Sequence, residues 1–382
     1  MASAEVADQA GGWATAYIHL PFCARVCPYC DFAVVAGRDE EIDRYLAAVA
    51  HEIENEPDWR PLDAVYVGGG TPSRVDPSRL ERLLAALIRR FGIRPDAEVS
   101  LEANPEDWSP QRAAALVRAG FNRVSLGAQN FHPEVLALLG RRHLPEAIPA
   151  AVEAAREAGF RTVNLDLIYG TPGETLAKWE ETLAAALAIE PDHVSCYALT
   201  VEPGTPLHRQ VRAGADAPDP DLQADQYEAA ARLLSAAGLI HYEVSNWARP
   251  GQECRYNLAV WAQAEYLGFG MAAHRYRAGI RSHGLSRLDH YLAEIEAGRP
   301  VQRGREMVGG WGREVERVFL GLRRRAGVTM GAAGTALIES GEGRRLMEAE
   351  VLAVDGDRLW VRRPLLTDAA LRALLALSPS EC

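Results

Sequence analysis

Lysine is nearly absent from this sequence, which has 41 basic residues of which only Lys178 is a lysine. A phosphate-binding loop of the GxxxxGK[ST] type is excluded, because the residue before Lys178 is alanine rather than glycine. No run of about 18 apolar residues occurs, so we expect no helix that spans a membrane. The first 16 residues lack the basic and apolar regions of a secretory signal, so none is expected.

Positive charge is also in deficit, since 52 acidic residues outnumber 41 basic ones and give a net charge of -11. We therefore expect no nucleic-acid partner, while peripheral contact with a membrane surface stays compatible with the sequence. Hydrophobic residues make up 48% and charged residues 24% of the chain, as in ordinary globular proteins. A chain of 382 residues has room for one large domain and a smaller one.

Cysteine is scarce and unevenly distributed. Three of the six cysteines lie within eight residues of one another, and Cys196, Cys254 and Cys382 are scattered. This distribution does not indicate a disulfide framework. A metal cluster held by the grouped cysteines would favour a reducing compartment, so we expect the protein to act in the cytoplasm.

The grouped cysteines lie in residues 17–32, YIHLPFCARVCPYCDF, directly after a short apolar strand. Cys23, Cys27 and Cys30 have CxxxCxxC spacing, and cysteine thiolates are the usual ligands of iron–sulfur clusters. Three thiolates on one loop can hold three irons of a 4Fe–4S cluster and leave the fourth iron open to a small molecule. The alternative is a closed zinc site, which needs a fourth ligand from His19, Cys196 or Cys254.

Apolar segments typical of strands alternate with amphipathic segments typical of helices up to about residue 240. The expected strands are 16–20, 64–67, 98–102, 123–127, 162–169 and 193–199. Alternation of this kind predicts βαβ units and a parallel sheet. Six units are too few for a closed barrel of eight strands, so the sequence predicts an α/β fold with an open partial barrel.

The carboxyl ends of these strands carry glycine or polar residues, where barrel proteins place their chemistry. They are the cysteine loop, the glycine run 68–70 with Thr71, Glu102, Gln129, Asp166 and Tyr197. Turns of this kind often carry glycine and polar residues, but six in succession indicate one shared cavity.

Three other regions depart from the alternation of strands and helices. Residues 1–15 are rich in alanine and glycine, and we expect a flexible tail before a core domain at 16–285. Within that core, residues 241–276 are dense in aromatic residues and glycine, which suggests a lid or a cavity wall. Residues 286–382 are expected to form a small α+β domain, with a hairpin that turns at Asp355-Gly356.

The cysteine loop resembles the signature of the radical S-adenosylmethionine (SAM) superfamily, with Tyr29 as the aromatic residue before the last cysteine. A GGGTP run at 68–72 and a YEVSNWA segment at 242–248 are similar to its oxygen-independent coproporphyrinogen III oxidase-like branch. The resemblance implies a partial (β/α)6 barrel with a C-terminal domain of the type found in that branch. It also implies a 4Fe–4S cluster whose open iron is chelated by SAM.

The same resemblance implies which residues contact SAM. The positions that match contacts to the cluster-bound SAM are Tyr17, Gly69, Glu102 and the backbone around His274. The positions that match contacts to a second SAM are Tyr29, Gly70, Thr71, Gln129, Arg141, Asp166 and Ala198. Considered singly, Arg141 could instead lie on the surface in the basic trio 141–143, and Asp166 could cap the following turn.

Two features favour the haem chaperones of this branch over its dehydrogenases. The dehydrogenases carry a fourth cysteine two places after the third and a longer N-terminal arm, whereas Asp31 and Phe32 follow Cys30 here. The resemblance thus implies haem delivery to an unidentified acceptor protein, with no catalytic residue assigned. The alternatives are oxidative decarboxylation of coproporphyrinogen and, more remotely, a zinc-stabilised scaffold.

One motif departs from the chaperone pattern. These chaperones carry HNxxYW, associated with haem binding, and residues 256–261 read YNLAVW. Asn257 and Trp261 match, while Tyr256 replaces the histidine and Val260 replaces the tyrosine. A phenolate can ligate haem iron less commonly than imidazole. Either Tyr256 ligates, or Cys254, His241 or His274 does, or haem binding has been lost.

Overall fold

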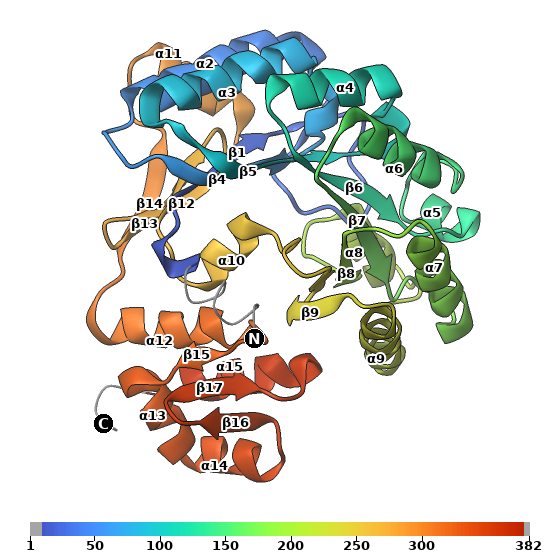
Figure 1. Cartoon of the computed structure of the whole chain (residues 1–382), viewed down its shortest axis with the longest axis vertical. Coiled ribbons are helices and arrows are strands. Elements are labelled where there is room, and N and C mark those ends of the chain that lie inside the picture. Colours follow the sequence, from blue (N-terminus) through green and yellow to red (C-terminus); the bar gives the residue numbers. More distant parts are fainter. Residues whose placement is uncertain (1–9, 378–382) are drawn as a thin grey trace.

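The computed structural model of the chain describes residues 10–377, and its centre is an open parallel barrel (Figure 1). Six parallel strands follow one another in space in their sequence order. They are β1 (Thr15–Leu20), β4 (Leu62–Gly69), β5 (Ile93–Ala103), β6 (Arg123–Gln129), β7 (Thr162–Tyr169) and β8 (His193–Ala198). The predicted partial barrel and its six strands are confirmed.

Helices cover the outer face of the barrel, as Figure 1 shows. They are α2 (Ile42–Asn55), α3 (Pro77–Phe91), α4 (Pro110–Ala119), α6 (Ala147–Ala158), α7 (Leu176–Ala188) and α9 (Pro220–Ala236). In α3 the side chain of Asp76 accepts a hydrogen bond from the Ser78 amide, and Pro77 occupies the first turn. Its leucines at 80, 83, 84 and 87 are buried against the sheet, as their helical spacing requires.

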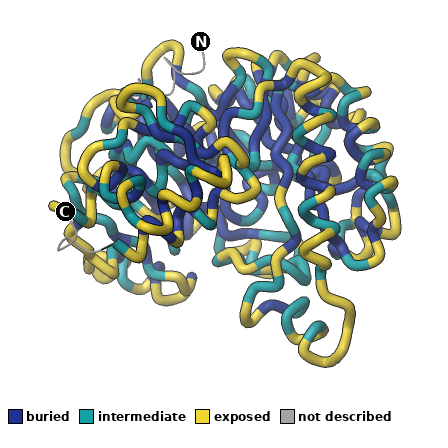
Figure 2. The backbone as a smooth tube through the Cα atoms, turned by 90° about the horizontal axis from the view of Figure 1, so that it is seen from below, coloured by how far each residue is buried: buried dark blue, intermediate teal, exposed yellow. Residues whose placement is uncertain are grey.

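Shorter elements connect these units. A 3-10 turn, η3 (Pro72–Arg74), follows β4, and another, η4 (Pro105–Asp107), follows β5. Two short helices, α5 (Pro133–Leu138) and α8 (Pro206–Arg212), lie in the connections after β6 and β8. The strands are buried and the outer loops exposed (Figure 2).

The sheet continues beyond the barrel at both edges and has twelve strands among the described residues. Beside β1 lie β11 (Tyr266–Phe269), β12 (His274–Arg277), β13 (Ile280–Gly284) and β14 (Gln302–Met307). Beside β8 lie β10 (Asn246–Ala248) and β9 (Ile240–Glu243), with β10 antiparallel to both neighbours. Residues 241–276 therefore belong to the wall of the barrel and do not form a lid, because they supply strands to both edges.

Helix α10 (Arg255–Trp261) lies between these two edges and fills the barrel from the end opposite the carboxyl ends of its strands. Glu98, in the middle of β5, accepts hydrogen bonds from the Arg255 amide at 3.1 Å and from Cys254 Sγ at 3.5 Å. Strands β1 and β4 contact the same helix. Glu98 lies four residues before Glu102 on β5, so α10 forms a floor beneath the strand ends that carry the predicted site.

The chain before β1 is ordered where it is described, which corrects part of the expected tail at 1–15. A 3-10 turn, η1 (Ala10–Gly12), contacts α10, and Ala10 is buried with Tyr242 and Leu258. Residues 1–9 lie outside the described residues. The small apolar side chains of η1 thus help α10 to close the barrel at the end opposite the cavity.

A separate apolar core forms the C-terminal unit. Its elements are α12 (Gly310–Gly321), β15 (Val328–Thr329), α13 (Gly331–Glu339), α14 (Gly341–Glu348), β16 (Leu352–Asp355), β17 (Arg358–Val361) and α15 (Thr367–Leu375). Strands β16 and β17 form the hairpin predicted at Asp355-Gly356. The change of core lies after β14 rather than at residue 286, because Tyr291 and Leu292 of α11 (Leu288–Glu296) belong to the barrel core.

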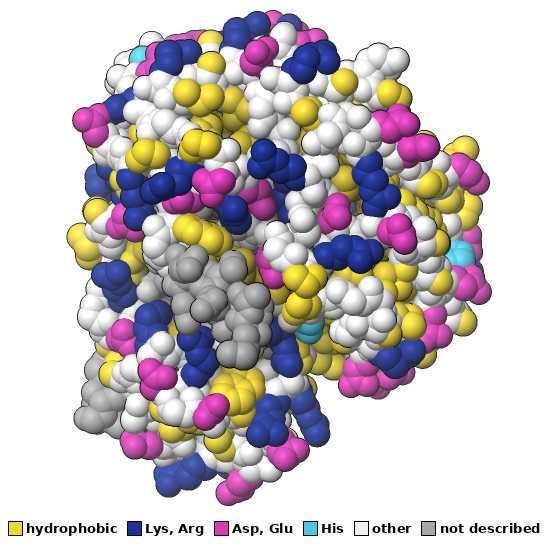
Figure 3. All heavy atoms as spheres, in the orientation of Figure 1, with side chains coloured by type: hydrophobic (Ala, Val, Ile, Leu, Met, Phe, Trp, Pro, Cys, Tyr) yellow, Lys and Arg dark blue, Asp and Glu magenta, His cyan; other side chains and the backbone are white. Residues whose placement is uncertain are grey.

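None of the described helices has the length and apolar character that crossing a bilayer requires. Over the face drawn in Figure 3, basic and acidic side chains are interspersed. Many charged side chains among the described residues are paired, as with Arg44 and Glu296 or Arg90 and Asp58. Such exposed pairs contribute little to stability.

Candidate metal and cofactor site

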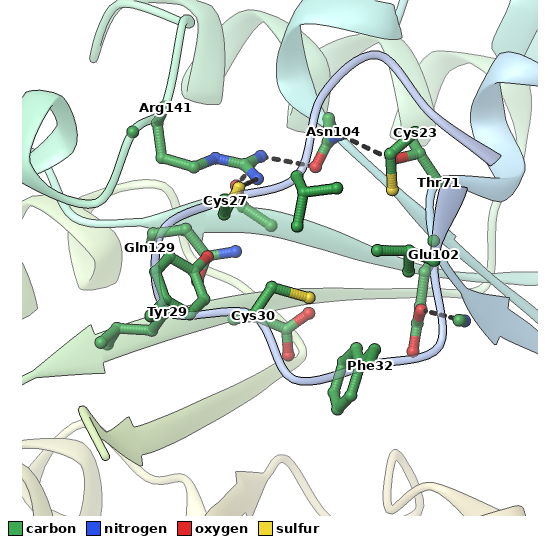
Figure 4. Close-up of a pocket in the computed structure, with 18 of the residues that line it drawn as sticks. Cys23, Cys27, Tyr29, Cys30, Phe32, Thr71, Glu102, Asn104, Gln129 and Arg141 are labelled. Carbon is green, nitrogen blue, oxygen red and sulfur yellow. Dashed lines mark hydrogen bonds between the residues drawn. The ribbon is translucent and has the colours of Figure 1, made fainter. Parts of the chain in front are cut away.

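A cavity of about 430 Å³ opens at the carboxyl ends of the barrel strands (Figure 4). It is lined by most of the residues that the sequence singled out. These are Cys23, Cys27, Tyr29, Cys30, Gly69, Gly70, Thr71, Glu102, Gln129, Arg141, Asp166 and Ala198. Most of them lie at the end of a strand or in the loop that follows it, so the parallel arrangement brings together residues that are up to 175 positions apart in the sequence (198 minus 23).

The three cysteines lie on a loop whose two ends are joined by a short parallel pair of strands. Phe22 of β2 (Phe22–Cys23) pairs with Val35 of β3 (Val35–Ala36), and the Cys30 amide donates to the Cys27 carbonyl at 3.1 Å. The three thiols are free and partly exposed, and they surround one space in Figure 4. Burial raises the pKa of Cys30 to about 11 and also raises that of Cys23, which a hydrogen bond from Thr71 opposes.

This arrangement fits a cluster with three thiolate ligands. Among residues 10–377 no three Cys, His, Asp or Glu side chains are grouped as ligands of one metal ion. An iron–sulfur cube takes its thiolates at separate corners, so its ligands are spaced more widely than those of one ion. The proposed fourth zinc ligands are engaged elsewhere: His19 Nε2 lies 2.8 Å from the Ala33 carbonyl oxygen, and Cys196 is buried within β8.

Gly69 and Glu102 are joined directly at the edge of the cavity. The Gly69 amide donates to Glu102 Oε2 at 2.9 Å, and the Tyr66 hydroxyl donates to Glu102 Oε1 at 3.1 Å. Gly69 has φ of 114°, and a Cβ there would lie 2.5 Å from the ring of His19. Glycine is therefore required at this position for both backbone conformation and space.

Tyr17 is one layer below these residues. It does not line the main cavity, but its hydroxyl lies 3.1 Å from His19 Nδ1, and the His19 ring abuts Gly69. The side chain of His274 is exposed on β12, away from the cavity lining. Its carbonyl oxygen abuts Gly268 of β11, so any contact with a ligand at this position would involve the backbone.

Two carboxyl groups, those of Glu102 and Asp166, face the cavity. Burial, and then the charge of Asp166, raise the pKa of Glu102 to about 7, although the bonds from Gly69 and Tyr66 oppose the shift. Burial also raises the pKa of Asp166, whose oxygens accept from Ser125 at 2.7 Å and Asn164 at 2.9 Å. Asp166 thus lines the cavity rather than capping a turn, and perturbed carboxyl groups in a cleft indicate a functional site.

Arg141 lies beneath the cysteine loop and not on the surface, with 8% of its side chain exposed. One of its terminal nitrogens lies 3.8 Å from Cys27 Sγ, and the other donates to Asn104 Oδ1 and to the Gly127 carbonyl. Gln129 ends β6 with φ of 63°, a conformation that residues other than glycine adopt rarely and often at functional sites. Sequence reasoning missed Asn104 and Tyr66.

The three residues of the altered haem motif lie in three different environments. Tyr256 packs among Tyr17, Tyr66 and Tyr266, with ring centroids 5.9, 5.3 and 6.2 Å away. Asn257 lines a smaller interior cavity beneath the main one, and the ring of Trp261 lies 4.8 Å from the guanidinium carbon of Arg323.

The other candidate haem ligands also lie in different environments. Cys254 is buried at the start of α10, and the His241 ring stacks on Trp247 with centroids 4.2 Å apart. His274 faces solvent beside His283, with ring centroids 5.5 Å apart.

Comparison with known proteins connects this geometry to a family. The model of the radical SAM superfamily matches residues 17–186. The chain is 44% identical to the haem chaperone HemW of Mycobacterium tuberculosis, with 94% of both chains covered. It is 36% identical to HemW of Bacillus subtilis, with 82% of this chain and 84% of that one covered.

A solved structure supports the fold independently. The radical SAM enzyme coproporphyrinogen III oxidase HemN of Escherichia coli matches with a TM-score of 0.81 and 22% identity. The match covers 97% of this chain and 92% of that one. At this identity the likeness shows a shared architecture, including the C-terminal unit.

Proposed function

The chain belongs to the haem chaperone HemW family of the radical SAM superfamily, and we propose that it binds haem and transfers it to an acceptor protein. The proposal includes a 4Fe–4S cluster and SAM at the cavity of the barrel. Its strongest support is the gathering of three free thiols, Glu102 and Arg141 around one cavity. A cytoplasmic location stays a prediction.

We assign the cluster to Cys23, Cys27 and Cys30. When bound, such a cluster would supply an iron without a protein ligand, which the amino and carboxylate groups of SAM can chelate. The loop contributes three thiolates from one side, and Arg141 contributes a positive charge near Cys27. That charge offsets part of the negative charge of a cluster with thiolate ligands.

For the cluster-bound SAM, Glu102 is proposed to accept hydrogen bonds from the ribose hydroxyls. Its carboxylate is held by Gly69 and Tyr66, so its orientation is set before the ligand arrives. Tyr17 supports this site from below, together with the backbone around His274. The proposed contacts of a second SAM line other parts of the same cavity: Tyr29, Gly70, Thr71, Gln129, Arg141, Asp166 and Ala198.

The haem site is the least constrained part of the proposal. Tyr256, Asn257 and Trp261 are retained as candidates because they occupy the motif positions. The packing of the half-buried Tyr256 ring against three other tyrosines favours a structural role for it. Haem ligation by His274, His241 or Cys254 is therefore part of the test.

Transfer of haem is favoured over conversion of coproporphyrinogen by one feature of the sequence. Asp31-Phe32 follow Cys30, in the place where the dehydrogenases have a further cysteine. The relatives at 36–44% identity are named as haem chaperones, whereas the oxidase shares the fold at 22% identity. The two activities can be separated by experiment.

The test is a titration of anaerobically reconstituted protein with ferric haem, with and without SAM. We expect a saturable shift of the haem absorption and no conversion of coproporphyrinogen when SAM and a reductant are present. Rapid conversion to protoporphyrinogen without saturable haem binding would favour the oxidase. Iron and acid-labile sulfide in the purified protein would exclude the zinc scaffold.

A further inference from the structure

A continuous chain of hydrogen bonds connects two of the three cysteines beneath the loop, and Asn104 is at its centre (Figure 4). Asn104 directly follows β5, two residues after Glu102. Arg141 donates to its Oδ1, and its Nδ2 donates to Thr71 Oγ1 at 3.2 Å. Thr71 Oγ1 lies 3.6 Å from Cys23 Sγ, and the other terminal nitrogen of Arg141 lies 3.8 Å from Cys27 Sγ.

These contacts have one consistent direction. A guanidinium can only donate, so Asn104 must present its oxygen to Arg141 and its amide nitrogen to Thr71. Thr71 then accepts from Asn104, which leaves its single hydroxyl hydrogen free to point at Cys23. Each group donates to the next, from the charge of Arg141 to the thiol of Cys23. Hydrogen bonds aligned in this way polarise one another.

The surroundings of Asn104 leave its side chain little freedom. A Cβ on Gly127 would lie 3.2 Å from Asn104 Oδ1 and 3.5 Å from the Arg141 nitrogen that bonds it, so glycine leaves room for this junction. Asp107 also accepts a hydrogen bond from the Asn104 side chain. Asn104 precedes η4 but makes no side-chain capping bond to it, so helix capping does not account for the residue.

We propose that Asn104 is a positioning residue that relays the charge of Arg141 to Cys23 through Thr71. One guanidinium thereby stabilises two thiolate ligands, Cys27 directly and Cys23 through the relay. Hydrogen bonds to the sulfurs of an iron–sulfur cluster stabilise its reduced, more negative state and raise its reduction potential. This inference rests on the cluster assignment of the proposed function, but its effect on the thiols exists without the cluster.

Asn104→Leu tests the relay without adding charge. In the cluster-free protein, we expect Cys23 to react with iodoacetamide more slowly near neutral pH, by up to about five-fold, the factor that complete loss of the hydrogen bond from Thr71 would give. Trypsin separates Cys23, in peptide 1–25, from Cys27 and Cys30, which share peptide 26–38. Fragmentation of the second peptide in the mass spectrometer distinguishes its two cysteines, so each rate is measurable. Cys30 has no contact with the relay and serves as the internal control.

Thr71→Val provides the second arm, since it removes the last donor to Cys23. The relay requires that Asn104→Leu has no further effect on Cys23 once Thr71 is valine. In the reconstituted protein, both single variants should lower the reduction potential of the cluster, whereas Asn55→Leu at the exposed end of α2 should not. Partial recovery of the potential by Asn104→Gln would support the hydrogen-bonding role.

Unchanged Cys23 reactivity in the Asn104→Leu protein would overturn the inference, as would additive effects of the two substitutions. Failure of the wild-type protein to assemble a cluster would refute the cluster assignment instead. The alkylation rates would still decide whether the relay exists. The two claims therefore fail by different observations.

Discussion

Glu102 combines two properties that a ligand-binding carboxylate needs. Two donors, the Gly69 amide and the Tyr66 hydroxyl, fix its position. Burial and the neighbouring Asp166 raise its pKa to about 7, so it changes charge within the physiological range. Only the ionised form can accept from both hydroxyls of a ribose, because a protonated carboxyl has one oxygen that must donate.

The affinity for SAM should therefore depend on pH. Raising the pH from 6 to 8 ionises Glu102, and a pKa near 7 predicts an affinity roughly ten-fold higher at pH 8. Glu102→Gln should lose this dependence and bind SAM more weakly at pH 8 by about 1–3 kcal/mol. Calorimetry on both proteins isolates Glu102, since any titration of the ligand itself is common to the two profiles. Parallel profiles would remove Glu102 from the site.

Tyr256 offers a contrast, because its surroundings suggest packing. Its ring contacts three tyrosines, so Tyr256→Ala should reduce the free energy of unfolding by about 2–4 kcal/mol. Tyr256→Phe keeps the ring and should preserve both stability and the haem absorption spectrum. A changed spectrum in the phenylalanine variant would instead identify the phenolate as the iron ligand, and His274→Ala and Cys254→Ser would then have no effect on it.

At the scale of elements, the cysteine loop and the β4–β5 strand ends act as one unit. Each of Cys23→Ala, Cys27→Ala and Cys30→Ala should abolish most bound iron and the cluster absorption near roughly 400 nm. Cys196→Ala and Cys254→Ala are the matched controls, because these thiols are buried outside the cavity. Iron and sulfide analysis of the anaerobically purified variants checks the assignment. A cluster retained after removal of all three loop cysteines would contradict it.

The sequence predicted the cysteine loop and the strand ends better than the hydrogen bonds that connect them. Alternating apolar segments gave all six parallel strands, and parallel strands necessarily bring their carboxyl ends together. Tyr66 and Asn104 were missed because their roles depend on hydrogen bonds between strands, which no local pattern records. The cysteine loop could be recognised because its ligands are local in sequence.

For the segment 241–276, the structure supports the expected cavity wall and not the alternative lid. Its aromatic and glycine content indicated a break, but its short strands pair with partners from opposite edges of the sheet. The boundary expected at residue 286 failed for a similar reason, because α11 packs on α2 from the start of the chain. Contacts between distant segments decide both cases, and composition alone does not contain them.

At the scale of the whole molecule, the C-terminal unit joins the barrel through backbone contacts beside a buried carboxyl group. The Val244 amide donates to the Arg323 carbonyl at 3.1 Å, and the Arg325 amide donates to the Tyr242 carbonyl at 3.0 Å. Glu243 lies between them with 1% of its surface exposed, and burial raises its pKa to about 7. Arg323 and a hydrogen bond from Asn246 oppose that shift.

This carboxyl group should make the stability of the protein depend on pH. Between about pH 4.3 and 7 the folded protein holds a proton on Glu243 that the unfolded chain has lost. The free energy of unfolding should therefore fall as pH rises through this window, by up to roughly 1.4 kcal/mol per pH unit for this group. Glu243→Gln should flatten the profile in urea unfolding. A slope equal to that of the wild type would show that Glu243 is ionised in the folded protein.

The central claim is that this radical SAM fold delivers haem rather than converting a porphyrin precursor. The most direct measurement follows haem from the loaded, cluster-containing protein to an apo-haem protein such as apomyoglobin, separated by size. We predict that the acceptor gains haem faster from the loaded protein than it does from haem bound to albumin. Coproporphyrinogen should be unchanged under the same conditions. Retention of haem together with formation of protoporphyrinogen would contradict the account.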